Sequence, residues 1–94
     1  MGWIVARFAV SFTYTRDKER IEQVRPVHRE YLRGLLEAGK LVESGPFADG
    51  SGALMIYEVD DLAAAQEQLA NDPYAINGII ATVSINEWNV TISR

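Results

Sequence analysis

The chain has 94 residues, of which 48% are hydrophobic and 23% are charged, and it carries a formal net charge of -4 with a pI near 4.8. This length and composition predict one globular domain over residues 1–94 with a single core. The acidic balance argues against nucleic-acid binding, which needs a concentrated basic face toward the phosphate backbone.

The chain contains no cysteine, which removes disulfides, thiol catalysis and cysteine-ligated metal sites together. Its first residues enter a strand pattern directly, without the basic and apolar regions of a signal peptide. No apolar run approaches the ~20 residues that a membrane span requires. We therefore expect a cytoplasmic protein with no membrane partner.

The first strand and the first helix are indicated by two different hydrophobic periods. Over residues 3–12 hydrophobic side chains alternate with a period of two, which is typical of a strand. A stripe with helical spacing follows and ends at Gly39. The stripe consists of Ile21, Val24, Val27, Tyr31, Leu32 and Leu35. Because Pro26 would kink an interior turn, we expect the main helix to begin near Pro26, after a looser turn over residues 17–24.

A hairpin is expected in the middle of the chain. Residues 40–47 predict a second strand, and Pro46 places it at an edge of the sheet because proline cannot donate to the ladder. A turn over residues 49–52 follows. Residues 53–59 are apolar at almost every position, which is typical of an interior strand covered on both faces.

A second helix is predicted next, with Asp60 or Asp61 as its N-cap. Its apolar side consists of Leu62, Ala65 and Leu69. Asp72-Pro73 stops it, since the residue before a proline is pushed out of the helical region.

The last strand begins at Ile79 after a short turn. Its hydrophobic positions change parity near Asn86-Glu87, which predicts a β-bulge or a crossing between two sheets. We expect the residues beyond that point, with Trp88 first among them, to pack against a partner subunit.

The element order is therefore β-α-β-β-α-β. Right-handed crossovers fold this order into a ferredoxin-like α+β domain, an antiparallel sheet with both helices on one face. The first and third strands should be central. Their apolar residues Trp3, Val5, Met55 and Tyr57 are assigned to the face without helices, where a monomer would expose a large apolar patch. We expect a homodimer that covers this face.

Four short motifs carry a resemblance to a known family. They are Arg25-Pro26-Val27-His28 before a leucine-rich helix, Ala38-Gly39-Lys40-Leu41, Ser44-Gly45-Pro46, and Asp72-Pro73-Tyr74. In this order they resemble the YciI (YCII-related) family over nearly the whole chain. The resemblance implies a dimeric α/β barrel and a pocket that contains a histidine and an aspartate, at positions that match His28 and Asp72. A few relatives act on halogenated or lactone-type intermediates of aromatic breakdown. Residues 14–24 are more charged than the family leads us to expect.

His28 is the only histidine and lies on the apolar stripe of the helix, so it points toward the sheet. One interpretation is a core histidine with a single hydrogen bond. The other is a general acid or base, because imidazole takes and returns a proton near neutral pH. A lone histidine has no second ligand at helical spacing, so we expect no metal site.

Asp72 precedes Pro73, and its side chain can cap the short turn that follows. In the alternative interpretation, its carboxylate faces the imidazole, fixes the tautomer and favours the imidazolium. Both roles are compatible if each carboxylate oxygen serves one of them.

Three further residues are candidates for substrate binding: Arg25, Ser44 and Tyr74. Ser44 has no partner histidine that would make it a nucleophile, so we expect it at most to orient a substrate. Arg25 and Tyr74 suit an anionic or aromatic substrate. The remaining arginines of the helix, with Arg29 and Arg33 among them, alternate with glutamates and are assigned to a solvated outer face.

Three functions fit these residues. The first is a cofactorless lyase or isomerase, of a dehydrochlorinase-like kind, in which His28 moves a proton on a small polar or aromatic-derived metabolite while Asp72 orients it. The second is a dimer that binds or senses a metabolite without converting it. The third is a structural interaction domain whose pocket is vestigial. The scattered glycines form no phosphate-binding or dinucleotide-binding loop, so we expect no cofactor.

Overall fold

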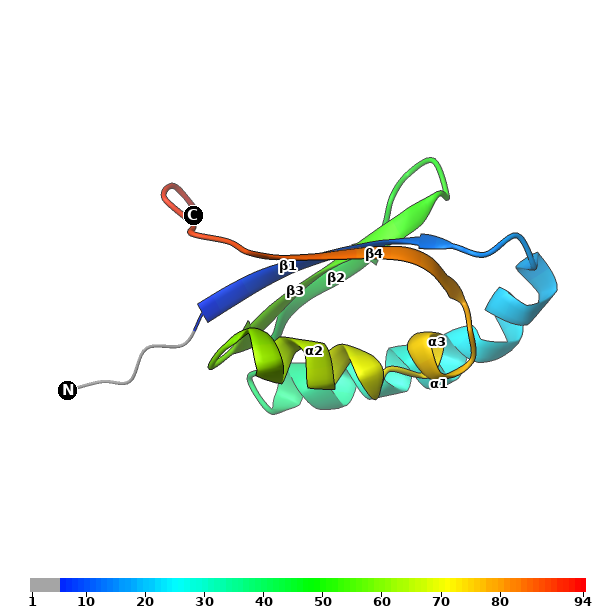
Figure 1. Ribbon diagram of the computed structural model, residues 1–94, viewed down its shortest axis with the longest axis horizontal. Helices are drawn as coiled ribbons and strands as arrows, with labels where there is room; N and C mark the ends of the chain where they lie inside the picture. Colours follow the sequence, from blue (N-terminus) through cyan, green and yellow to red (C-terminus); the bar gives the residue numbers. More distant parts are fainter. Residues whose placement is uncertain (1–5) are drawn as a thin grey trace.

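A computed structural model describes residues 6–94. The elements in chain order are β1 (Ala6–Tyr14), α1 (Lys18–Glu37), β2 (Leu41–Pro46), β3 (Gly52–Val59), α2 (Leu62–Ala70), α3 (Pro73–Ile76) and β4 (Ile80–Glu87). The four strands form one antiparallel sheet in the order β2-β3-β1-β4, and the helices lie on one side of it (Figure 1). This arrangement confirms the ferredoxin-like α+β fold, with β1 and β3 central and β2 at an edge. The predicted strand residues 3–5 lie outside the described part of the chain.

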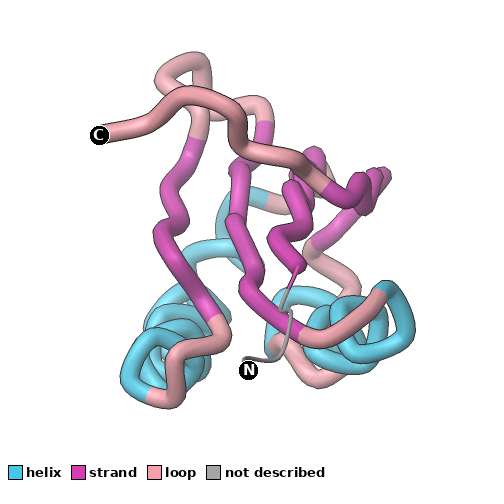
Figure 2. The backbone as a smooth tube through the Cα atoms, turned by 90° about the vertical axis from the view of Figure 1, so that its left-hand side faces the viewer, coloured by secondary structure: helices cyan, strands magenta, loops and turns pink. Residues whose placement is uncertain are grey.

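The core lies between the sheet and the helices, which Figure 2 shows below the strands. Val10 of β1 pairs with Met55 of β3, and Phe8 pairs with Tyr57. These four side chains are almost fully buried within the core cluster that includes helix residues such as Leu32. The assignment of Met55 and Tyr57 to the open face was therefore wrong. Residues 53–59 are apolar on both parities, so the sequence carries no signal for which parity faces the helices.

Helix α1 starts earlier than predicted. It runs without a break from Lys18, and Asp17 caps it by accepting a hydrogen bond from the Arg20 N–H at 3.1 Å. Pro26 lies inside the helix on its exposed side. Water can therefore hydrate the Glu22 carbonyl that loses its partner, which lowers the cost of the proline. Val27 is also exposed and lies outside the apolar stripe.

Helix α2 begins after Asp61, whose carboxylate accepts a hydrogen bond from the Ala64 N–H at 2.8 Å. Of its predicted apolar side, Ala65 and Leu69 are buried, but Leu62 in the first turn is 47% exposed. The turn after this helix forms the short helix α3, for which Asp72 is the N-cap.

The end of the last strand also differs from the prediction. β4 ends at Glu87, and Trp88, Val90 and Ile92 lie beyond it. The register of β1 with β4 changes between Thr13 and Tyr14, not near Asn86. The parity change in the sequence therefore marks the point where the strand stops.

Within residues 6–94, no helix is both long enough and apolar enough to cross a membrane.

Candidate active site

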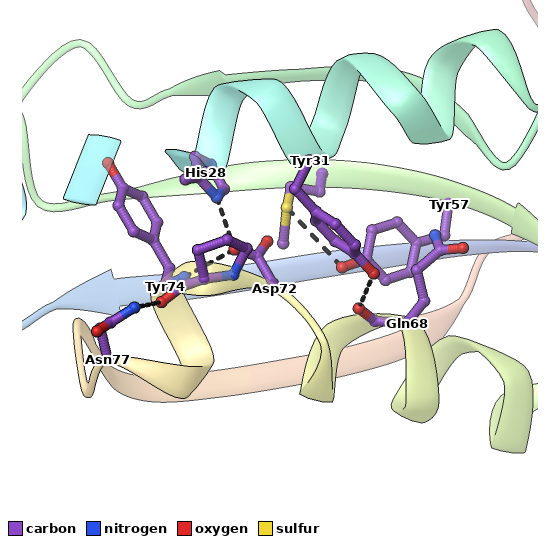
Figure 3. A network of polar contacts seen from close by, with 9 residues as sticks. His28, Tyr31, Tyr57, Gln68, Asp72, Tyr74 and Asn77 are labelled. Atoms are coloured by element: carbon purple, nitrogen blue, oxygen red, sulfur yellow. Dashed lines mark hydrogen bonds and ion pairs between the residues drawn. The ribbon is translucent and has the colours of Figure 1, made fainter. Parts of the chain in front are cut away.

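The centre of the site is a hydrogen bond between His28 and Asp72, shown in Figure 3. His28 Nδ1 lies 2.7 Å from Asp72 Oδ1, and the two side chains are 8% and 0% exposed. Helix α1 supplies the histidine from its buried stripe, and the start of α3 supplies the aspartate. Residues 44 positions apart therefore meet because α1 and α3 pack side by side.

The tautomer of His28 follows from the partners of Asp72. Oδ1 of this carboxylate also accepts a hydrogen bond from the Tyr74 N–H at 2.8 Å. Because an ionised carboxylate only accepts hydrogen bonds, His28 Nδ1 carries the proton and donates it. The neutral ring then has a free lone pair on Nε2, as a general base requires.

Capping and orienting are thus both performed by Asp72, as the sequence allows. The prediction assigned one carboxylate oxygen to each role, but in the structure Oδ1 serves both. Oδ2 is buried and has no hydrogen-bond partner among the described residues. The carboxylate is therefore held at one oxygen only.

Tyr74 fixes the plane of the imidazole. Its ring stacks on His28 with centroids 3.7 Å apart and an interplanar angle of 7°. The ring of Tyr74 also meets Phe12 and Tyr14 edge-on at 6.1 and 6.0 Å. Tyr74 is 2% exposed, so the imidazole is clamped between a packed aromatic group and a carboxylate, and its orientation is preset.

A second layer of tyrosines lies beside Asp72 (Figure 3). The Tyr31 hydroxyl donates to the Gln68 carbonyl at 2.6 Å, whereas the nearest partner of the Tyr57 hydroxyl is Met55 Sδ at 3.9 Å. Burial, and then the negative charge of Asp72, raise the pKa of both phenols above the ordinary value near 10. Both tyrosines therefore stay neutral across the physiological range.

The raised pKa of Tyr57 gives a pH dependence with a definite sign. The stabilisation is complete below pH 10, where the unfolded phenol is still protonated, and it is lost as the pH rises toward the higher folded-state pKa. Tyr57→Phe should change the free energy of unfolding little at neutral pH. Above pH 10 it should reduce the loss of stability by about 1.4 kcal/mol per pH unit.

Urea unfolding at neutral and alkaline pH checks this expectation. Tyr14→Phe is the matched control, because Tyr14 is only partly buried and its variant should give a smaller change in the alkaline slope. Equal slopes for wild type and Tyr57→Phe would contradict it.

His28 opens on a cavity of about 890 Å³. One wall is a flank of α1, and the other consists of β2 and the turn that joins it to β3. His28 and Tyr74 both line it, and Nε2 is neither hydrogen-bonded within residues 6–94 nor fully buried. The free nitrogen is therefore the one that faces the cavity.

The cavity brings together most of the predicted site residues. Arg25, His28, Ser44 and Tyr74 line it, and Asp72 lies behind His28 without reaching it. No group of three or more His, Cys, Asp or Glu side chains within residues 6–94 is arranged to hold a metal ion.

The lining residues that sequence reasoning missed or misassigned include Tyr14, Lys18, Arg29 and Arg33. Arg29 and Arg33 belong to the wall of the cavity and not only to an outer helix face. The spacing of positions 25, 29 and 33 by four places them on one flank of a helix, but it does not show what stands opposite that flank.

The fold and the site together define a ferredoxin-like α+β protein with a buried His–Asp pair beside an open cavity. The chain belongs to the family described as the YCII-related domain, whose model matches residues 6–89. It is 33% identical over 89 residues to Protein YciI of Escherichia coli O6:H1 and of Shigella flexneri, with 80% of this chain and 91% of each relative covered.

A solved structure shares the fold. It is 5-chloro-2-hydroxyhydroquinone dehydrochlorinase from Burkholderia phenoliruptrix in complex with 2,5-dihydroxybenzoquinone. It superposes with a TM-score of 0.78 at 19% identity and covers 88% of this chain and 93% of that chain. The family model and the two YciI relatives confirm the family assignment predicted from the sequence motifs.

Proposed function

We propose that this protein is a cofactorless enzyme of the lyase or isomerase type, in which His28 transfers a proton on a small polar or aromatic-derived metabolite. The observation that carries the proposal is the 2.7 Å contact between His28 Nδ1 and Asp72 Oδ1, with Nε2 left free at the cavity. A purely structural histidine would have both ring nitrogens satisfied or sealed. In this protein Asp72 holds Nδ1 of His28 in place, while Nε2 is free to contact a substrate.

The chemistry assigned to each residue follows from its position. His28 Nε2 removes a proton from a bound substrate, and the electron pair of the broken bond forms a new double bond as a leaving group departs or the double bond migrates. Asp72 is a positioning residue that stabilises the imidazolium formed in this step. Release of the proton to water or back to the substrate restores the base. Ser44, on the wall formed by β2, and Tyr74, beside His28, orient the substrate.

The activity and the ligand of the structural neighbour suggest which compounds to test first. That protein is a dehydrochlorinase, and its ligand is a hydroxylated quinone. Removal of a proton and a chloride from a hydroxylated ring suits a free Nε2 in a cavity that the rings of Tyr14 and Tyr74 also line. We therefore propose small hydroxylated rings and related lactones as the substrate class.

The test is a panel of chlorinated hydroxyquinols and lactones incubated with the protein, with release of chloride and loss of substrate as readouts. Conversion that depends on His28 supports the proposal. Val27→Ala, on the exposed side of α1, is the matched control and should behave as wild type. Compounds that bind but are never converted would contradict the proposed enzyme. That result would favour a protein that binds or senses a metabolite.

We also propose that the protein is a homodimer. The helices cover one face of the sheet only (Figure 1), and the other face carries Ala9 and Leu54, both partly exposed, on its two central strands. Beyond β4, Trp88 is 45% exposed and Ile92 is 92% exposed. An open face of this kind, continued by exposed apolar residues, suits burial against a second copy.

Sedimentation should therefore show a dimer at micromolar concentration. Truncation after Glu87, which leaves β4 intact, should shift the equilibrium toward monomer because it removes Trp88 and Ile92. The truncated chain must keep the circular dichroism of the full chain for the comparison to hold. A full-length monomer, or an unchanged mass after truncation, would contradict the corresponding part of the proposal.

A further inference from the structure

The cavity beside His28 is positively charged although the whole chain is acidic. Four cationic side chains line it, against two acidic ones, in a chain of net charge -4. The cations are Lys18, Arg25, Arg29 and Arg33, and the acids are Glu22 and Glu43. A concave surface with a surplus of one sign concentrates ligands of the opposite sign.

Three of these cations, Lys18, Arg25 and Arg29, have no carboxylate partner within 4.0 Å in the described part of the chain. Arg33 pairs with Glu30 at 3.4 Å. Arg25 and Arg29 make no ion pair within 4.0 Å with any residue of the described chain. Residues four apart on a helix are neighbours on its surface, so their guanidinium groups can act on one ligand. His28 precedes Arg29 directly on the same helix.

Arg25 and Arg29 line the same cavity as the aromatic rings of Tyr14 and Tyr74. Burial and then Tyr74 raise the pKa of the Tyr14 phenol, and the positive charges of Arg25 and Arg29 act in the opposite direction. This agrees with two arginines that share one cavity surface with the phenol.

We propose that Arg25 and Arg29 bind the anionic group of the substrate. The cavity then prefers small organic acids, such as carboxylates or ionised hydroxyquinones, to neutral compounds of the same shape. The inference rests on the proposed function and names the substrate class of the same site. Arginine matches a planar carboxylate with paired, charge-assisted hydrogen bonds. With the anion fixed at this flank of α1, the carbon skeleton reaches Nε2 across the face of the cavity.

A matched pair of probes separates charge from shape: 2,5-dihydroxybenzoate and its neutral amide, 2,5-dihydroxybenzamide. Calorimetric titration of the full chain should show that the acid binds at least about tenfold more tightly than the amide. The preference should shrink as ionic strength rises. Arg25→Gln and Arg29→Gln should each weaken binding of the acid by about tenfold and leave the amide unchanged.

Arg16→Gln is the control for net charge. Arg16 is exposed, lies outside the cavity and makes no ion pair within residues 6–94, so its variant should bind both probes as wild type does. The inference is overturned if the acid shows no saturable binding at millimolar concentration. It is also overturned if acid and amide bind equally, or if Arg16→Gln loses as much affinity as Arg25→Gln.

Failure of this inference is distinguishable from failure of the proposed function. Acids that bind through Arg25 and Arg29 but are never converted would refute the enzyme and keep the anion site. Conversion of neutral compounds as fast as of acids, still dependent on His28, would refute the anion site and keep the enzyme.

Discussion

A His28→Gln variant is expected to convert any substrate of this protein about 10²–10⁴-fold more slowly than wild type, the usual contribution of one general base. Glutamine keeps a polar side chain of similar length but cannot take up a proton. His28 Nε2 is the ring nitrogen that faces the cavity, while Nδ1 is bonded to Asp72 at 2.7 Å. The loss should therefore appear in kcat and not in substrate binding.

The measurement is a steady-state assay of both proteins on the first compound that the panel shows to be converted. Thermal unfolding of the variant is the control for folding, and a ligand that still binds shows that the cavity persists. A variant that retains more than a tenth of the wild-type rate would remove His28 from the chemical step.

Replacing Asp72 by alanine should destabilise the protein by about 2–4 kcal/mol, among the largest effects of any single substitution in this site. Asp72 is fully buried, and its Oδ1 accepts from both His28 Nδ1 and the Tyr74 N–H. Alanine leaves two buried donors without an acceptor and removes the N-cap of α3.

Asp72→Asn separates the hydrogen bonds from the charge. The amide oxygen can still accept at the position of Oδ1, so the loss in urea unfolding should be clearly smaller than for alanine. Equal losses for the two variants would show that the charge, and not the acceptor, stabilises the fold. A loss below about 1 kcal/mol for alanine would contradict the role given to this buried contact.

Much of the fold was predictable because local signals agree with one another. The period of two over β1, the caps at Asp61 and Asp72, and the proline at the end of β2 each carry a local physical cause. The order of these elements then leaves few topologies. The His–Asp pair could be named from the family motifs, but its contact depends on how α1 packs against α3.

The misassigned features depend on tertiary structure. Whether Pro26 breaks α1 depends on the exposure of that side of the helix, which cannot be read from the sequence. Which parity of β3 faces the helices cannot be read from a strand that is apolar on both. Arg29 and Arg33 line the cavity because the β2–β3 hairpin stands opposite their flank of α1, a placement that periodicity alone leaves open.

The most direct test of the proposed acid–base pair is the tautomer of His28, observed by ¹⁵N NMR of the imidazole in wild type and in Asp72→Ala. Neutral His28 in wild type should carry its proton on Nδ1 and have an unprotonated Nε2. In Asp72→Ala, where no acceptor faces Nδ1, a mixture of the two tautomers should appear. A proton on Nε2 in the neutral wild-type protein, or the same tautomer ratio in both proteins, would contradict the proposed acid–base pair.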